Sequence, residues 1–150
     1  MTFHPRWDQH ALDCAGDTYH VVATDDLANY FVRQGLLATH PLVRRSYILE
    51  QGGSLDGPGL VYHEGYSHNF VDCELSVLAR SRGVYVFCRD ARVEHRHPAF
   101  KSAQMDSTYE YGMRDFARDR ALFCDRMAGY SQDPLVRRFI RAEMQLRRRA

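Results

Sequence analysis

The sequence predicts an α/β fold with a short mixed sheet followed by C-terminal helices. Two runs, YHVVAT at 19–24 and VYVFC at 84–88, are rich in β-branched and aromatic residues, which is typical of buried strands. From Tyr109 to Met127 and again from Leu135 to Met144, apolar residues recur at helical spacing. Because strand patterns come first and helical patterns last, we expect one layered mixed domain.

Length and composition narrow the class of protein further. The 150 residues suit a single domain, and an apolar content of 45% is enough to form a core. The net charge of +1 predicts no general attraction to nucleic acid or to membranes. Nearly all basic residues are Arg, which permits anion binding, although codon usage is the plainer explanation. With no long apolar run and no signal-peptide pattern, we expect a soluble, cytoplasmic protein.

Local signals predict the remaining elements. We expect a short helical or irregular segment at 7–13, an extended stretch at 36–45, a helix at 46–51 stopped by Gly52, a helix at 73–82 capped by Asp72, and a short strand at 91–95. Ser107 and Glu110 form a capping box for the helix that ends at Gly129, and Asp133-Pro134 begins the last helix. We therefore separate a main portion, 1–130, from a basic amphipathic helix, 131–150.

The four cysteines, Cys14, Cys73, Cys88 and Cys124, are widely spaced and contain no C-x-x-C pair. This spacing argues against a zinc knuckle and indicates small buried hydrophobic side chains.

The densest polar cluster is HEGYSHNFVDCE, from His63 to Glu74. Asp72 and Glu74 fall at the expected start of a helix, where backbone N–H groups and the positive helix end favour an ionised carboxylate. An ionised carboxylate can act as a general base at neutral pH. The structural alternatives are that Asp72 is only a helix cap and that Glu74 only favours the helix dipole.

Two further groups could bind a metal. His95 and His97 are two residues apart after a strand pattern, so they would share one face and bind a divalent ion together with carboxylates from elsewhere. Two ordinary surface histidines are the alternative. Asp25 and Asp26 follow the first buried strand and could hold Mg²⁺ or sugar hydroxyls, or form a solvated turn.

The order of these clusters resembles family 2-like glycosyltransferases of the GT-A fold. The resemblance runs from FHPRWD at residue 3 to ALFCDR at residue 126. It includes TYHVVATDDL, HPLVRRSYILEQGG, HEGYSHNFVDCEL, RGVYVFCRDARVEHRHP and MDSTYEYGMRDFARDRALFCDR. The motifs D-x-E-L, R-x-x-G and V-x-H-x-H-P occur in that order. The resemblance implies a partial GT-A fold and a hexosyltransferase type of activity that uses a nucleotide-sugar donor.

The resemblance also implies roles for the polar clusters. Asp72 would be the catalytic base that deprotonates the acceptor hydroxyl in inverting transfer, and Glu74 would support it. His95 would be a metal ligand, with His97 as the close alternative. The implied ion is Mn²⁺ or Mg²⁺, which neutralises the departing diphosphate.

A second set of residues would contact the substrates. The resemblance implies that Asp25 and Asp26 line the sugar or acceptor pocket and that His68 contributes to it. It also implies that Gly52 and Gly53 let the backbone approach the donor sugar, because glycine lacks a Cβ.

In the family, a D-x-D metal motif and nucleotide-binding βαβ units precede the F-H-P-x-W segment, with which this chain begins. We therefore expect that a separate polypeptide supplies that half, that the gene product is truncated, or that its start site is misassigned. Exposed apolar surface at the place where that half would dock predicts a partner chain or a homo-oligomer. Two alternatives stay open. One is a non-catalytic binding module that uses the basic helix, with Arg137, Arg141 and Arg147. The other is a metal-dependent hydrolase that uses His63, His68, His95 and His97.

Overall fold

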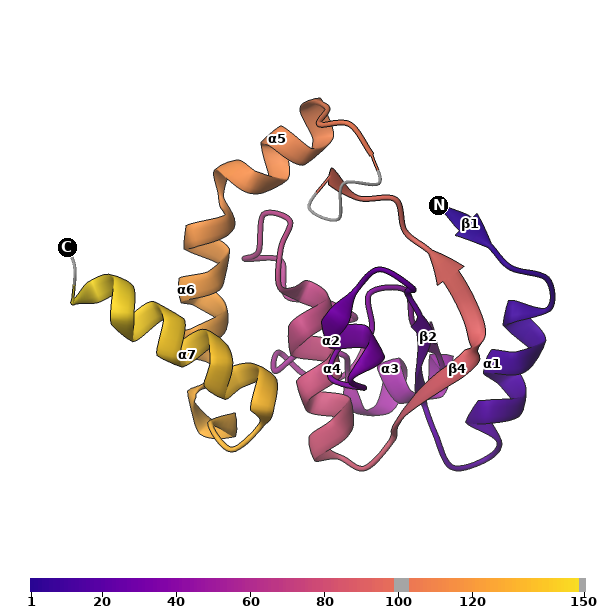
Figure 1. Ribbon diagram of the computed structural model, residues 1–150. Helices are drawn as coiled ribbons and strands as arrows, with labels where there is room; N and C mark the ends of the chain where they lie inside the picture. The colour runs from indigo at the N-terminus through magenta and orange to yellow at the C-terminus, as the bar shows by residue number, and fades with distance from the viewer. Residues whose placement is uncertain (99–102, 149–150) are drawn as a thin grey trace.

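A small mixed sheet with helices on both faces forms the centre of the protein. The computed structural model describes residues 1–98 and 103–148 (Figure 1). The strands are β1 (Thr2–Phe3), β2 (Val21–Asp25), β3 (Leu42–Val43) and β4 (Tyr85–Glu94). The helices are α1 (Trp7–Ala15), α2 (Tyr30–Arg33), α3 (Arg45–Gln51), α4 (Val71–Ser81), α5 (Ser107–Arg114), α6 (Phe116–Arg126), the 3₁₀ turn η2 (Ala128–Tyr130) and α7 (Pro134–Arg147).

The four strands lie in the order β1-β4-β2-β3. The central pair, β2 and β4, is parallel, whereas β1 and β3 are antiparallel to their neighbours. The carboxyl ends of β2 and β4 therefore meet at one edge of the sheet, and the segment that leads into β3 passes it, where the Thr24 hydroxyl donates to the carbonyl oxygen of His40. Chain segments far apart in sequence converge there.

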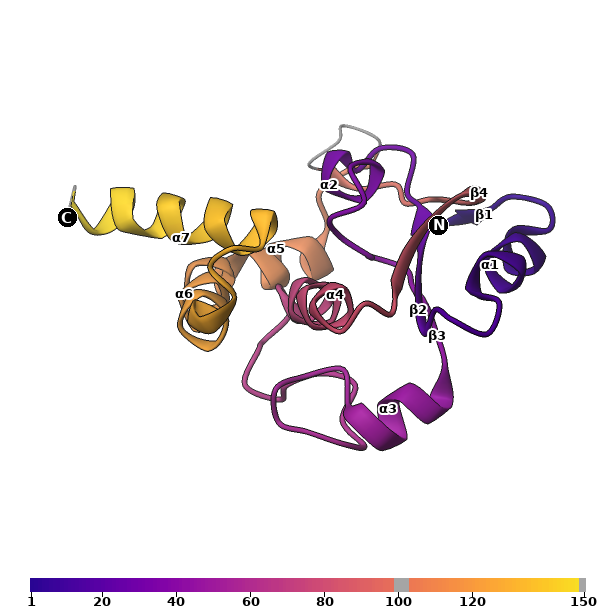
Figure 2. The same ribbon diagram turned by 90° about the horizontal axis from the view of Figure 1, so that it is seen from below.

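Each face of the sheet is covered by a helix, because side chains on a strand alternate between the two faces. Figure 2 shows α1 on one side of the strands and α4 on the other. Val22 and Cys88 pack with Ala11 of α1. Val21 packs on the opposite side with Tyr47, Leu75 and Ala79 of α3 and α4. The expected α/β class is thus confirmed.

The C-terminal helices pack on α4 rather than on the sheet, so that α4 has a second buried face (Figure 1). Phe123 of α6 and Leu135 and Val136 of α7 share one apolar cluster with Phe70 and Val77. The amphipathic helix expected at 131–150 therefore shares a core with the main portion.

Several local predictions are confirmed. The run at 19–24 forms β2, whose residues are all buried. Gly52 ends α3 with φ 75, a left-handed value that glycine adopts readily. Asp133 caps α7, because its side chain accepts hydrogen bonds from the backbone N–H groups of Leu135 and Val136. Of the four cysteines, Cys73, Cys88 and Cys124 are buried and Cys14 is half-buried.

Other local predictions are wrong. Asp72 does not cap α4, which begins at Val71 after Phe70, a residue with φ 70. The strands expected at 84–88 and 91–95 are both present, but they are joined in the single strand β4, which pairs with β2 across an irregularity between Thr24 and Asp25 and then with β1. Of the stretch expected to be extended at 36–45, only Leu42–Val43 is a strand.

The long helix predicted to precede the last helix is divided in the structure. The stretch expected as one helix from Ser107 to Gly129 forms α5 and α6, with Asp115 between them, and the turn η2. Asp106, rather than Ser107, stabilises the start of α5 by accepting the N–H of Tyr109 at 3.2 Å. Within residues 1–98 and 103–148, no helix combines the length and apolar character that crossing a membrane requires.

Candidate metal centre and adjoining cavity

A carboxylate and two imidazoles meet at the edge of the sheet where β2 and β4 end. One ligand atom from each of Asp26, His40 and His95 lies within 4.8 Å of the others. Asp26 follows β2, His95 follows β4, and His40 lies just before β3. The parallel β2–β4 pair and the antiparallel β3 therefore bring residues 26, 40 and 95 together. We name these three residues the metal-ligand group.

The metal-ligand group contains buried polar atoms that lack partners. Asp26 is 0% exposed. Among the described residues, no hydrogen-bond partner reaches Asp26 Oδ1 or His40 Nε2. Because a buried polar atom without a partner costs free energy, such atoms in a native protein indicate a missing interaction. A bound cation would satisfy both.

Neighbouring threonines orient the group. The Thr39 hydroxyl donates to Asp26 Oδ2 at 3.3 Å, and the Thr24 hydroxyl donates to the carbonyl oxygen of His40 at 2.8 Å. The rings of His40 and His95 lie edge to face with 4.9 Å between their centroids. Two imidazoles and one carboxylate form a donor set that suits a divalent transition metal.

The surroundings favour the neutral imidazole that metal binding requires. Burial lowers the pKa of His40, and the neighbouring His95 lowers it further, while Asp26 opposes both effects. A neutral ring keeps a lone pair for a metal, so proton competition is reduced.

His97, the other predicted metal ligand, lies beside the metal-ligand group but outside it. The centroids of the His95 and His97 rings are 5.3 Å apart, and His97 packs edge to face on Tyr109 at 4.6 Å. Burial and the proximity of His95 lower the pKa of His97, partly offset by Asp26. The structure therefore groups His95 with Asp26 and His40, whereas the sequence paired it with His97.

A cavity of about 470 Å³ adjoins the metal-ligand group. His40, His95 and His97 line it together with Asp72 and His68. Its apolar wall includes Phe70, Phe116 and Phe139, and Tyr62 and Asn69 add polar groups. The predicted base and the predicted metal ligand thus line the same cavity.

Asp72 is half-buried as the second residue of α4, and its Oδ1 accepts the N–H of Cys73 at 2.9 Å. Burial raises the pKa of Asp72, and the hydrogen bonds from the backbone and the charge of His68 offset only part of this effect. The expectation that the helix start favours ionisation of Asp72 is therefore wrong. Desolvation outweighs the contribution of the backbone N–H groups.

Glu74 has a different environment and does not line the cavity. Arg126 donates from Nε to Glu74 Oε2 at 2.9 Å and from Nη2 to Oε1 at 2.7 Å. The hydroxyl of Tyr66 and the N–H of Leu55 donate to the same carboxylate. Burial raises the pKa of Glu74, but these hydrogen bonds outweigh burial and hold the pKa below its usual range. Its oxygens are thus occupied by contacts that join α4 to α6.

Asp119 of α6 holds the loop that carries His68. Its carboxylate accepts the backbone N–H groups of Ser67, His68 and Asn69 at 3.0, 3.0 and 2.9 Å. Burial raises the pKa of Asp119, and these three bonds more than compensate, so the pKa lies below its usual range. Asp119 therefore positions one wall of the cavity. No sequence pattern indicated this, because Asp119 lies some fifty positions from its partners.

The two glycines predicted to approach a donor sugar instead allow close packing of the chain. A Cβ at Gly52 would lie 1.9 Å from the carbonyl oxygen of Gly57, and one at Gly53 would lie 2.3 Å from that of Val61. Neither glycine lines the cavity. Their role in this structure is to close the 52–61 loop on itself.

Asp25, predicted as a pocket residue, also does not line the cavity. It is 3% exposed, and its Oδ1 lies 3.8 Å from Nε of Arg33. The sequence suggested that Asp25 and Asp26 act together at one site. In the structure the two carboxylates have different surroundings, because Asp26 belongs to the metal-ligand group and Asp25 lies near Arg33. Comparison with protein families, curated proteins and solved structures found no match.

Proposed function

We propose that this chain forms the metal- and acceptor-side portion of a GT-A type glycosyltransferase, which transfers a sugar from a nucleotide-sugar donor to an acceptor hydroxyl. The observation that carries the proposal is that Asp72 borders the same cavity as His40 and His95, two of the three residues of the metal-ligand group. The ordered sequence motifs support the same activity. Base and Lewis acid are the two groups that such a transfer needs.

In this proposal the metal-ligand group holds a divalent cation, which would neutralise the charge that develops on the departing diphosphate. Asp72 accepts the proton of the acceptor hydroxyl as that oxygen bonds to the sugar carbon and the bond from carbon to diphosphate breaks. The raised pKa of Asp72 supports this role, because a base accepts a proton most effectively when its pKa approaches the working pH.

The rest of the cavity suits the orientation of a polar ligand. His68 and Tyr62 line the cavity together with Asp72, so hydroxyls of an acceptor beside Asp72 would meet hydrogen-bonding groups. Phe116 and Phe139 form an apolar wall. An apolar pocket with a few placed polar groups is the usual form of a small-molecule site.

The donor set also favours one of the expected ions. Mg²⁺ prefers six oxygen ligands in an octahedron, whereas imidazole nitrogen suits transition metals. Two of the three side chains in the metal-ligand group are imidazoles. Of the two ions that the sequence suggested, we therefore propose Mn²⁺.

A metal-dependent hydrolase is the second candidate, and the same donor set favours it. Two histidines and one carboxylate also form zinc sites of hydrolases, where Asp72 would act on a water molecule. The histidine set expected for this alternative is revised. His95 is grouped with His40 and Asp26, whereas Nδ1 of His63 is hydrogen-bonded to Asp56 at 2.7 Å.

Calorimetric titration with UDP- and GDP-sugars, with and without Mn²⁺, tests the proposal. We expect donor binding that requires Mn²⁺ and is lost in His95→Ala and His40→Ala. His10→Ala serves as the matched control, since His10 lies on α1, across the sheet from α4. Stoichiometric zinc binding without any nucleotide-sugar binding would favour the hydrolase. Equal binding by wild type and His95→Ala would overturn both candidates.

A further inference from the structure

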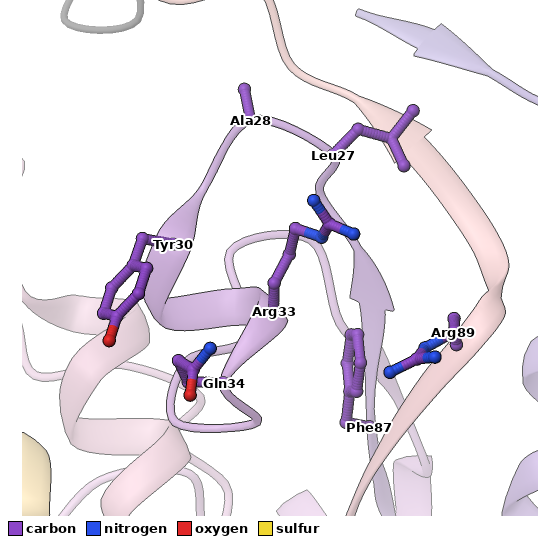
Figure 3. A pocket seen from close by; sticks show the side chains of 7 residues that line it. All are labelled: Leu27, Ala28, Tyr30, Arg33, Gln34, Phe87 and Arg89. Carbon is purple, nitrogen blue, oxygen red and sulfur yellow. The ribbon is translucent and has the colours of Figure 1, made fainter.

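A second pocket lies beside α2, and Figure 3 shows the side chains that line it. Its volume is about 420 Å³, and its lining includes Tyr30, Arg33, Gln34, Phe87 and Arg89. It shares no lining residue with the cavity beside the metal-ligand group. The pocket combines two guanidinium groups with two aromatic rings, a composition that the proposed transfer reaction does not use.

The two arginines come from different elements and have different surroundings. Arg33 is the last residue of α2, and Arg89 lies on β4. Figure 3 shows the Arg89 guanidinium turned toward the Phe87 ring and the Arg33 side chain extending beside Leu27. Among residues 1–98 and 103–148, Arg89 makes no ion pair, so its charge is available to a ligand.

The carboxylate of Asp25 lies near Arg33 but does not line the pocket. The Asp25 carboxylate is 3% exposed, and its Oδ1 has no hydrogen-bond partner among the described residues but lies 3.8 Å from Arg33 Nε. The contact is made through Nε, so it leaves the terminal N–H groups of Arg33 for other contacts. The negative charge of Asp25 balances the positive charge of Arg33, so the net charge beside the pocket is the positive charge of Arg89.

We propose that this pocket binds a small organic anion, with its phosphate or carboxylate held by Arg33 and Arg89. The planar guanidinium presents paired N–H donors that match the oxygens of both anions. The Phe87 ring is half-buried in the pocket and Tyr30 is 65% exposed at its side, so an aromatic or apolar body attached to the anion packs against them. The Gln34 amide adds a hydrogen-bonding group.

This inference does not depend on the proposed transfer reaction, because the anion pocket and the metal-ligand group have no residue in common. The two can therefore be tested separately. Loss of metal binding in His95→Ala would leave anion binding intact, and loss of anion binding in Arg89→Gln would leave metal binding intact.

The test is calorimetric titration of the full chain with phenyl phosphate, benzoate and inorganic phosphate. We expect phenyl phosphate or benzoate to bind more tightly than inorganic phosphate, and the tighter of the two identifies the anion class. Arg89→Gln should weaken binding about tenfold, as loss of one charge-assisted contact does. Tyr30→Ala should weaken the aromatic probes but not inorganic phosphate.

Arg45→Gln is the matched control, because Arg45 is an exposed arginine on α3 and does not line the pocket. An equal loss of affinity in Arg45→Gln and Arg89→Gln would show that the anions are attracted to positive charge anywhere on the protein. That result would overturn the proposal. Absence of saturable binding of all three probes up to about 10 mM would also overturn it, since that limit corresponds to less than about 3 kcal/mol of binding free energy.

Discussion

Two carboxylates of one motif, Asp72 and Glu74, have opposite environments at the scale of single residues. Burial raises the pKa of Asp72, whose carboxylate borders the cavity. Burial also raises the pKa of Glu74, but Arg126 and Tyr66 donate hydrogen bonds to its oxygens, and these bonds lower the pKa below its usual range. Environment alone can therefore give two nearby carboxyl groups different properties. We infer that Asp72 is available for chemistry and that Glu74 holds α4 to α6.

Asp72→Asn tests this division. Asn keeps an oxygen that can accept the N–H of Cys73 but cannot act as a base. If Asp72 is the general base, the rate of sugar transfer should fall at least about a hundredfold. The midpoint of thermal unfolding should be unchanged or higher, because the variant no longer places a charge in a desolvated site.

Transfer rates and calorimetric unfolding are measured on the same preparations for this comparison. A parallel fall in activity and in unfolding midpoint would assign Asp72 to structure. Asp125→Asn is a suitable control, since Asp125 is exposed on α6 and does not line the cavity.

At the scale of elements, the cavity depends on contacts between segments that are distant in sequence. Asp119 of α6 accepts three N–H groups of the 67–69 loop, and Asn69 donates to the carbonyl oxygen of Gly112 in α5. Arg80 of α4 pairs with Asp133, which also caps α7. The C-terminal helices therefore act as a support for the loop that carries His68.

Asp119→Asn should destabilise the protein by about 2 kcal/mol, because a neutral amide accepts the three buried N–H groups less well and brings donors that have no acceptor there. Urea unfolding measures this change. His68 should also lose its fixed position, so the affinity for ligands in the cavity should fall even where the variant remains folded. Asp125→Asn, on the same helix, should have little effect on either quantity. Unchanged stability in Asp119→Asn would contradict the supporting role.

For the whole molecule, buried carboxylates determine the response to acid. The pKa values of Glu74 and Asp119 are lowered in the folded state, by hydrogen bonds that outweigh burial. Their stabilising contribution is therefore present above the pKa of the unfolded chain and is lost as the pH falls through the lower folded values. Asp72 has a raised pKa, so its contribution has the opposite sign and opposes this loss.

The free energy of unfolding should accordingly decrease as the pH is lowered from 7 through the acidic range in which Glu and Asp ordinarily titrate. Glu74→Gln removes one of the groups responsible. It should be less stable than wild type at neutral pH and show a shallower decrease with acid. Urea unfolding at a series of pH values measures both. Parallel curves for wild type and Glu74→Gln would contradict this account.

Much of the local structure could be predicted from the sequence because it depends on neighbouring residues. The β-branched run of β2, the left-handed Gly52 after α3 and the Asp133-Pro134 start of α7 all follow from chemistry within one turn or strand. His95 was identified as a metal-ligand candidate from its place after a strand, and the acidic pair at 25–26 was identified as a candidate for a metal or sugar hydroxyls. These predictions required no knowledge of the residues that contact these side chains in the folded protein.

Only the tertiary structure decided which of these candidates meet. His40 lies in a short stretch beside Pro41 that has no distinctive pattern, and the antiparallel pairing of β3 with β2 brings it to Asp26 and His95. The pKa of Asp72, the occupied oxygens of Glu74 and the loop held by Asp119 likewise depend on residues distant in sequence. Sequence determined the chemical groups and the local elements. Strand order and helix packing decided their neighbours, because burial and hydrogen bonding act between segments that only the fold brings together.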